Sequence, residues 1–289
     1  MEALILTPDS SPLTRNIEDY PEGIIIPIDK PYRWTSADVI RKVKFAAIRH
    51  FGKKNLKVGH AGTLDPLATG VLLVCIGKAT KLAEELQSHD KEYVAGVTFG
   101  ATTPSYDLEK EIDRFFPYDH ITAEGVAEAL PGFIGEQDQI APLFSAKSVD
   151  GVRAYELARK LHAEGKTLDE AAQELIRVSK INITALKLEE YIEASENCGD
   201  PEVGGVVLST AVSDASSRIN VTDNSALGLP RAVIRMSCSK GTYVRAFARD
   251  LGEKLGSGAH LDSLQRSRSG TFCVENALSV DQTLSLLQK

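Results

Sequence analysis

Several segments of this sequence alternate in the manner of half-buried strands, and helical segments lie between them. This pattern limits the chain to a fold that mixes strands and helices. In residues 91–100, KEYVAGVTFG, one face of a strand would hold Tyr93, Val97 and Phe99, because side chains in a strand alternate with a period of two. The segment 231–241, RAVIRMSCSKG, alternates in the same way. Half-buried strands of this kind are typical of antiparallel or mixed sheets. We therefore expect an α+β fold with a mixed, mainly antiparallel sheet flanked by helices.

The remaining elements follow from apolar spacing and from capping residues. Further strands are predicted at 23–31, 71–77 and 179–192. Helices are predicted from Thr35 or Ser36 to about Phe51, and near 79–88, 121–130, 151–164, 242–256 and 280–289. Residues 1–22 lack periodicity and are expected to form a loose extension. Residues 23–289 are expected to form one domain, with a polar surface insertion near 194–229.

Composition excludes several classes of protein. A chain of 289 residues with 43% hydrophobic and 25% charged residues is globular. Its four cysteines lie far apart without C-x-x-C spacing, which argues against a zinc ribbon or a disulfide scaffold and favours a reducing compartment. The N-terminus lacks a signal-peptide pattern, and no apolar run reaches the roughly 18 residues of a membrane span. We expect a cytoplasmic protein that does not enter the membrane and, by default, a monomer.

Charge is patterned more strongly than the net value of -7 suggests. Residues 41–57 contain many bases and no acid, and residues 189–202 contain many acids and no base. The basic stretch, which includes Lys53 and Lys54, could be an ordinary solvated helix face. It could equally bind a polyanion, because a polyanion responds to a local patch and not to the net charge.

One short stretch, GHAGTLDPLATG at 59–70, surrounds a single acid with glycines and a proline. Asp65 before Pro66 is ordinary turn chemistry. The glycines also allow the backbone to approach a ligand while the turn presents the carboxylate. A catalytic carboxylate would need a cation to keep it ionised. Arg245 is a candidate, although with Arg249 at i,i+4 it could simply be a surface pair.

Two ring side chains have a structural and a functional interpretation. Tyr93 could be a core tyrosine, or an aromatic plane on which a flipped base stacks. His60 could be structural, or a wedge that fills the space left by displaced bases. No second histidine lies at metal-ligand spacing, so the sequence predicts no metal site. It also lacks a G-x-G-x-x-G or Walker motif, and we expect no cofactor.

Five motifs in order resemble the TruB family of tRNA pseudouridine synthases. They are IDKPYRWTSADVIRKVK (28–44), VGHAGTLDPLATGVLLVCIGKATKLAEEL (58–86), KEYVAGVTFGATT (91–103), QIAPLFSAKSVDGVRAYELAR (139–159) and SKGTYVRAFARDLGEKLGSGAHLDSLQRSRSG (239–270). The resemblance runs from about Gly23 to Phe272. It implies the pseudouridine synthase catalytic fold and, as substrate, the uridine at position 55 in the T-loop of tRNA.

The resemblance also implies roles for individual residues. Asp65 falls on the catalytic aspartate, Arg245 on the arginine paired with it, and Tyr93 on the tyrosine that stacks on the target uracil. The residues that match the family's RNA and uridine contacts are His60, Tyr243, Leu264, Lys30 and Pro31. Lys53 and Lys54 would then position phosphates of the tRNA T-arm.

The sequence departs from the family at several places. The family commonly has Gly where Arg33 stands and Thr where Ala61 stands, and it usually has a Thr-Asp-Thr-like run where this chain reads Thr-Pro-Ser at 103–105. The insertion near 194–229 is unusually long. After Phe272 too little chain remains for the C-terminal PUA domain of many relatives.

The resemblance implies an isomerase without redox or phosphoryl chemistry. The ionised Asp65 would attack the anomeric carbon of ribose, or add to the uracil ring, and the sequence does not choose between the two. One alternative is an inactive RNA-binding or RNA-chaperone protein on the same fold. Another is a haloacid-dehalogenase-type phosphatase, which would need a second Asp where Leu67 stands. A guide-RNA-dependent relative is disfavoured by the missing C-terminal RNA domain.

Overall fold

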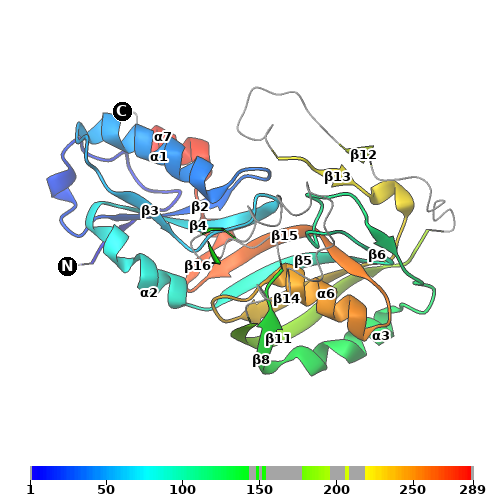
Figure 1. Cartoon of the computed structure of the whole chain (residues 1–289). Coiled ribbons are helices and arrows are strands. Elements are labelled where there is room, and N and C mark those ends of the chain that lie inside the picture. The colour runs from blue at the N-terminus through cyan, green and yellow to red at the C-terminus, as the bar shows by residue number, and fades with distance from the viewer. Residues whose placement is uncertain are drawn as a thin grey trace. The chain divides into compact units, whose positions relative to one another are not determined.

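The computed structural model describes residues 2–142, 148–149, 152–153, 178–195, 206–207 and 219–287 (Figure 1). The chain divides into two compact units. Unit 1 comprises Met1–Val94, Ser209–Asn220 and Ser263–Lys289, and unit 2 comprises Ala95–Leu208 and Val221–Asp262. Strands β5 (Lys91–Phe99) and β15 (Ala259–Ser269) each contribute residues to both units. The predicted extent of one catalytic domain, 23–289, stays a prediction.

Unit 1 is built on a mixed sheet. Its strands follow the order β1 (Leu4–Ile5), β2 (Ile24–Lys30), β4 (Ala68–Ile76), β15 and β5. The β1–β2 and β4–β15 pairs are parallel, whereas the β2–β4 pair is antiparallel. Two short strands, β3 (Val58–Ala61) and β16 (Phe272–Cys273), pair antiparallel with β4 and β15. The mixed sheet, mainly antiparallel and flanked by helices, confirms the predicted fold class.

The two faces of this sheet bury different helices. Ile24, Ile26 and Ile28 point into a core formed with α1 (Ser36–Phe51) and α7 (Val280–Leu286). Ile25 points to the opposite face, against the 3-10 helix η2 (Gly77–Leu82) and α2 (Ala83–Ser88). Alternate side chains of β2 and β4 therefore pack against two different layers of helices, which Figure 1 shows on either side of the strands. A continuous apolar run such as VLLVCI suits a strand that is buried on both faces.

The ends of α1 match the sequence prediction. Thr35 is the N-cap and forms a capping box with Asp38. Gly52 ends the helix in the left-handed conformation, with φ of 64°, as glycine does at many helix ends. The helix packs its buried stripe, which includes Val39 and Val43, against the sheet.

Unit 2 contains strands in the order β15, β5, β14 (Arg231–Cys238), β11 (Val178–Ile192) and β8 (Gly135–Ile140). Strand β11 pairs antiparallel with β14 and with β8. In the described part of unit 2 the α-helices are α3 (Ala123–Ala129) and α6 (Val244–Lys254). Among the described residues of both units, the remaining short elements are η1 (Ile17–Asp19), β6 (Ala101–Thr102), β7 (Arg114–Phe115), η3 (Leu130–Phe133), β9 (Ser148–Val149), β10 (Val152–Arg153), β12 (Val206–Val207), β13 (Thr222–Asp223), η5 (Ser225–Leu227) and η6 (Val274–Asn276).

The N-terminal segment differs from its prediction. Instead of a loose extension, Leu4 and Ile5 pair in parallel with β2. Leu6 and Leu13 are buried in the core beneath α1. The sequence lacked the usual signal because a strand of two residues shows no periodicity. The segment is held by burial of these two leucines and by the edge of the sheet.

Three further predictions, two of them on partly described segments, can be compared with the structure. The helix expected near 79–88 begins as a 3-10 helix, η2, before α2. The helix expected at 151–164 lies outside the described residues except for 152–153, which are in strand β10. The insertion near 194–229 is described only at 194–195, 206–207 and 219–229. Within it Val221 and Leu227 are buried, so this part packs into unit 2.

Candidate active site

The loop between β3 and β4 carries Asp65 in a reverse turn. The amide of Ala68 donates to the carbonyl of Asp65 at 3.1 Å, with Pro66 at the second position of the turn, which its fixed φ favours. Gly62, at the start of the loop, has φ of 95°. The side chain of Asp65 is half-buried. The loop therefore satisfies the turn interpretation while leaving the carboxylate partly accessible.

A buried arginine on β15 holds the first half of this loop. Arg266 is 1% exposed. Its Nη2 donates to the carbonyl of Gly62 at 3.1 Å, and its Nη1 lies 3.5 Å from the carbonyl of Thr63. Its Nε donates to the carbonyl of Val71 at 2.7 Å, on β4. Because the guanidinium is planar and rigid, these donors fix the loop against the strand.

Two further side chains hold the rest of the loop. The amide of Leu64 donates to Ser36 Oγ at 3.0 Å. Because Thr35 caps α1, the Ser36 hydroxyl is available for this contact. The Nζ of Lys30 donates to the carbonyl of Pro66 at 3.2 Å and to that of Trp34 at 2.6 Å. The backbone on both sides of Asp65 is thus bonded to buried side chains.

Burial shapes the charge states around the loop. Desolvation lowers the pKa of Lys30 to about 7, and the nearby carboxylate of Asp65 opposes that shift. Burial also lowers the pKa of His60, and the charge of Arg266 lowers it further. The imidazole of His60 is therefore neutral at pH 7. Its Nδ1 is buried and has no hydrogen-bond partner among the described residues.

Most of the predicted site residues of unit 1 lie around this loop or on its neighbouring strands. His60 is on β3, and Leu264 pairs with Ala68, the residue that closes the Asp65 turn. Tyr93 and Leu264 are partly buried and pack against the same core. Pro31 follows β2 directly, and its carbonyl accepts from Lys30 at 2.9 Å.

The two predicted phosphate contacts lie after the end of α1. Lys53 and Lys54 are exposed. Lys53 forms an ion pair of 3.0 Å with Glu18, which lies outside the acid-free stretch. An exposed pair of this kind contributes little to stability, so Lys53 can exchange Glu18 for another anion.

Unit 2 positions Arg245 and Tyr243 at the start of α6. Tyr243 is the N-cap residue, and its amide donates to Gln139 Oε1 at 2.8 Å. Arg245 is 4% exposed, its Nη1 donates to the carbonyl of Ser105 at 3.2 Å, and its Nε lies 3.7 Å from Asp107 Oδ2. A cation in the first turn opposes the helix dipole, and the carboxylate of Asp107 offsets this.

The sequence interpretation missed several residues of this arrangement. Arg266 and Asp107 were not singled out, and Ser36 was named only as a possible start of a helix. Arg266 carried a usable signal. It lies two residues after the predicted pocket residue Leu264, and residues two apart in a strand face the same side. Asp65 and Arg245 belong to different units, and their pairing stays a prediction.

One departure from the family pattern, Arg33, has an unusual backbone conformation. Arg33 stands where the family resemblance implies Gly, and its φ is 64°. Glycine adopts this left-handed region without a steric penalty, whereas other residues do not. The Nη2 of Arg33 donates to the carbonyl of Ile219 at 2.7 Å, a contact that glycine could not make.

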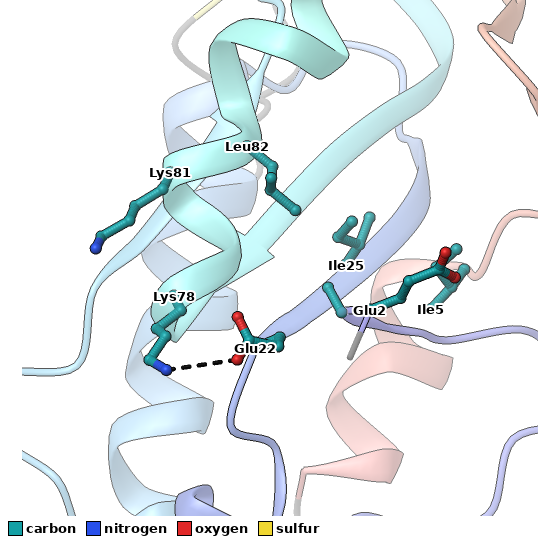
Figure 2. A pocket seen from close by; sticks show the side chains of 8 residues that line it. Glu2, Ile5, Glu22, Ile25, Lys78, Lys81 and Leu82 are labelled. Atoms are coloured by element: carbon teal, nitrogen blue, oxygen red, sulfur yellow. Dashed lines mark ion pairs between the residues drawn. The ribbon is translucent and has the colours of Figure 1, made fainter.

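A pocket of about 550 Å³ in unit 1 lies away from this chemistry. Figure 2 shows its lining side chains, with Lys78 turned toward Glu22 at 3.6 Å. It is lined by Glu2, Ala3, Ile5, Glu22, Ile25, Lys78, Lys81 and Leu82. None of these residues is a predicted site residue, so the pocket is not the candidate active site.

The described residues also limit other kinds of site. Within them, no group of three or more His, Cys, Asp or Glu side chains is placed to hold a metal ion. In the same part of the chain, every helix is too short or too polar to cross a membrane.

Comparison with protein families gives one clear match. Residues 49–200 match the family described as TruB family pseudouridylate synthase (N terminal domain). The match spans the loop with Asp65 and the strand with Tyr93.

Two curated relatives extend the likeness over most of the chain. A tRNA pseudouridine synthase B of Phocaeicola vulgatus is 46% identical over 263 residues, which cover 91% of this chain and 92% of the relative. A protein of the same name from Chloroherpeton thalassium is 34% identical, covering 93% of this chain and 92% of the relative. The likeness therefore includes both units.

Solved structures support the fold alone. A Cbf5-Nop10-Gar1 complex contains a chain with a TM-score of 0.55 and 22% identity, covering 97% of this chain and 64% of that one. An H/ACA RNP bound to a substrate RNA containing 2'-deoxyuridine gives a TM-score of 0.54 at 21% identity, covering 91% of this chain and 53% of that one. The architecture of both units is thus shared with proteins of low sequence identity.

Proposed function

The chain belongs to the TruB family of pseudouridylate synthases, and from this premise we propose that it modifies the uridine at position 55, in the T-loop of tRNA. The enzyme is an isomerase that converts uridine in tRNA to pseudouridine. The observation that carries the assignment of its centre is the loop at Asp65. Three buried side chains hold its backbone, while the carboxylate stays partly accessible.

Asp65 is the catalytic carboxylate in this proposal. A nucleophilic carboxylate must be ionised and must be held where the reacting carbon will lie. Arg245 supplies the counter-charge, as the family resemblance implies, and it cannot lose its own proton. Two routes are open to Asp65: attack on the anomeric carbon of ribose, or addition to the uracil ring. In both, the bond from ribose to the uracil nitrogen breaks and a carbon–carbon bond replaces it.

The remaining residues receive and hold the nucleotide. Tyr93 stacks on the uracil while the detached base turns over, and Tyr243 and Leu264 line the uridine pocket. The neutral imidazole of His60 fills the space left when bases are flipped out. Flipping costs a few kcal/mol, and stacking of the base on an aromatic ring returns part of that cost.

Binding of the T-arm uses phosphate contacts outside the pocket. Lys53 and Lys54 are exposed on unit 1 and neutralise phosphates, which positions the RNA without reading its sequence. Lys30 supports the Asp65 loop through its bond to the carbonyl of Pro66, and the carbonyl of Pro31 accepts a second bond from the same Nζ. The enzyme acts as a monomer in the cytoplasm in this proposal.

The test is turnover by Asp65→Asn. The variant keeps the size of the side chain but lacks the nucleophilic charge, so we expect it to fold, to bind tRNA and to make no pseudouridine. The exposed Asp90→Asn is the matched control and should retain activity. Mass-spectrometric mapping of a tRNA transcript measures both the rate and the position. Turnover by Asp65→Asn would refute the catalytic role, and product at another uridine would refute the position.

A further inference from the structure

The outward side of α1 carries the most exposed large hydrophobic side chain among the described residues. Phe45 is 71% exposed, and the next, Val178, is 57% exposed. Single exposed hydrophobic side chains are common on protein surfaces and need no explanation by themselves. The surroundings of Phe45 are what give it meaning.

Basic residues surround Phe45 on the helix. Arg41 and Arg49 lie four residues before and after it, so both neighbour it on the same helical face. Lys42 and Lys44 border it on either side, and all four bases are exposed. We call this surface the Phe45 face: Arg41, Lys42, Lys44, Phe45 and Arg49.

The charges of this face are only partly neutralised. Arg41 pairs with Asp38 at 2.8 Å, and Lys42 lies 5.0 Å from the ring centroid of Trp34. Lys44 and Arg49 have no acidic partner among the described residues. The face therefore combines an aromatic ring open to solvent with two basic side chains, those of Lys44 and Arg49, that can bind an anion.

We propose that the Phe45 face binds an unpaired nucleotide of the tRNA substrate, outside the pocket of the target uridine. The base stacks on the ring of Phe45, and Arg49 and Lys44 contact the adjoining phosphates. Proteins bind single-stranded nucleic acids by stacking nucleobases on exposed aromatic side chains that lie among positively charged residues. A protein partner is disfavoured, because Lys42 and Lys44 border the ring of Phe45 and lysine is depleted in protein interfaces.

This inference rests on the proposed function only in its choice of tRNA as the polyanion. It adds a second contact, so the two proposals fail separately. Loss of the Phe45 contact weakens binding without touching Asp65, whereas the catalytic assignment depends on turnover by Asp65→Asn.

The test compares three substitutions at Phe45 with an unmodified tRNA transcript as probe. Phe45→Ala should raise the Kd and the KM for tRNA roughly tenfold, as removal of one stacked base does, and leave kcat at saturating tRNA unchanged. Phe45→Trp should restore binding, and Phe45→Leu should not. Phe115→Ala, which removes a ring that is 38% exposed on β7, is the control.

Fluorescence of Phe45→Trp gives a direct readout. The natural chain has one tryptophan, Trp34, which is 8% exposed and supplies the baseline. Stacking of a nucleobase should add quenching of the fluorescence of Phe45→Trp on titration with tRNA. In a separate binding measurement, Arg49→Ala should lower the slope of log Kd against log salt by roughly 0.7. Unchanged affinity of Phe45→Ala, or full affinity of Phe45→Leu, would overturn the inference.

Discussion

The Nη2 of Arg266 donates a hydrogen bond of 3.1 Å to the carbonyl of Gly62, across 204 residues of sequence. Gly62 lies three residues before Asp65, and its φ of 95° turns the chain into the loop. The strand β15 thereby fixes the backbone that carries Asp65, the proposed catalytic carboxylate. A small displacement of a reacting group costs much rate, so this contact bears on kcat more than on binding.

Substitution of Arg266 tests this relationship. Arg266→Met leaves the carbonyls of Gly62 and Val71 buried without their donor, which should lower the free energy of unfolding by about 2–4 kcal/mol. We expect kcat to fall at least about tenfold with little change in KM, and Arg266→Lys to recover part of the loss. Steady-state kinetics and urea unfolding measure the two effects.

Arg268→Met is the matched control, because Arg268 lies on the same strand but is 35% exposed. It should leave kcat unchanged. A folded Arg266→Met that kept its full kcat would show that the loop needs no support from β15.

Stability should rise with pH because of Lys30. Its pKa is about 7 in the folded chain, while the unfolded chain keeps the ordinary value near 10.4. Between these values the unfolded chain binds one more proton, so the free energy of unfolding increases as pH rises from about 7 toward 10. Below the folded pKa both states are protonated and this dependence ends.

The measurement is urea unfolding at pH 7 and pH 9.5. The difference between the natural chain and Lys30→Met should grow with pH, whereas the difference for the exposed Lys78→Met should stay constant. An equal difference for Lys30→Met at both values would mean that Lys30 stays charged in the folded chain.

Arg33 offers a test of backbone strain. Both Arg33→Gly and Arg33→Ala lose the bond to Ile219, but only glycine fits a φ of 64° without cost. We expect Arg33→Gly to be more stable than Arg33→Ala by about 1 kcal/mol. Thermal unfolding of the two variants measures it, and equal stability would show that position 33 relaxes out of the left-handed region.

Gly70 tests the close approach of β4 to β15. Its φ is 96°, and a Cβ there would lie 2.2 Å from the carbonyl oxygen of Arg266. Gly70→Ala should lower the free energy of unfolding by about 3 kcal/mol or more, since strain and overpacking add. Gly52→Ala, at φ of 64° with open space around it, should cost only about 1 kcal/mol. Similar losses in both would exclude the backbone clash as the cause.

The sequence predicted elements whose signals are local. Helix α1 was placed at both ends because Thr35 caps it and its apolar stripe stops at Phe51. Strand β5 was placed by its alternation, and β4 by a continuous apolar run. In each case the residues that decide the structure lie within the element itself.

Features that depend on distant residues were predicted less well. Leu6 is buried, but nothing in the first residues indicates the sheet edge that they meet. Arg266 could be assigned to the inward face of its strand, but its carbonyl partners could not be identified. Asp107 approaches Arg245 through the fold of a loop, for which no sequence pattern exists. The roles of Asp65, Tyr93 and Arg245 remain predictions from the family.

The parallel pairing of β4 with β15 has a consequence for how the protein is made. Residues 68–70 leave the ribosome before unit 2 is synthesised, whereas their partners at 264–266 are synthesised after it. Unit 1 cannot complete its sheet before then, because its two main segments are separated by unit 2 in the chain. Until then residues 68–70 of β4 lack their partner on the edge where β3 pairs only with residues 73–76, and an unpaired strand edge favours aggregation in a nascent chain. Truncated translation products of this protein are therefore expected to need chaperones.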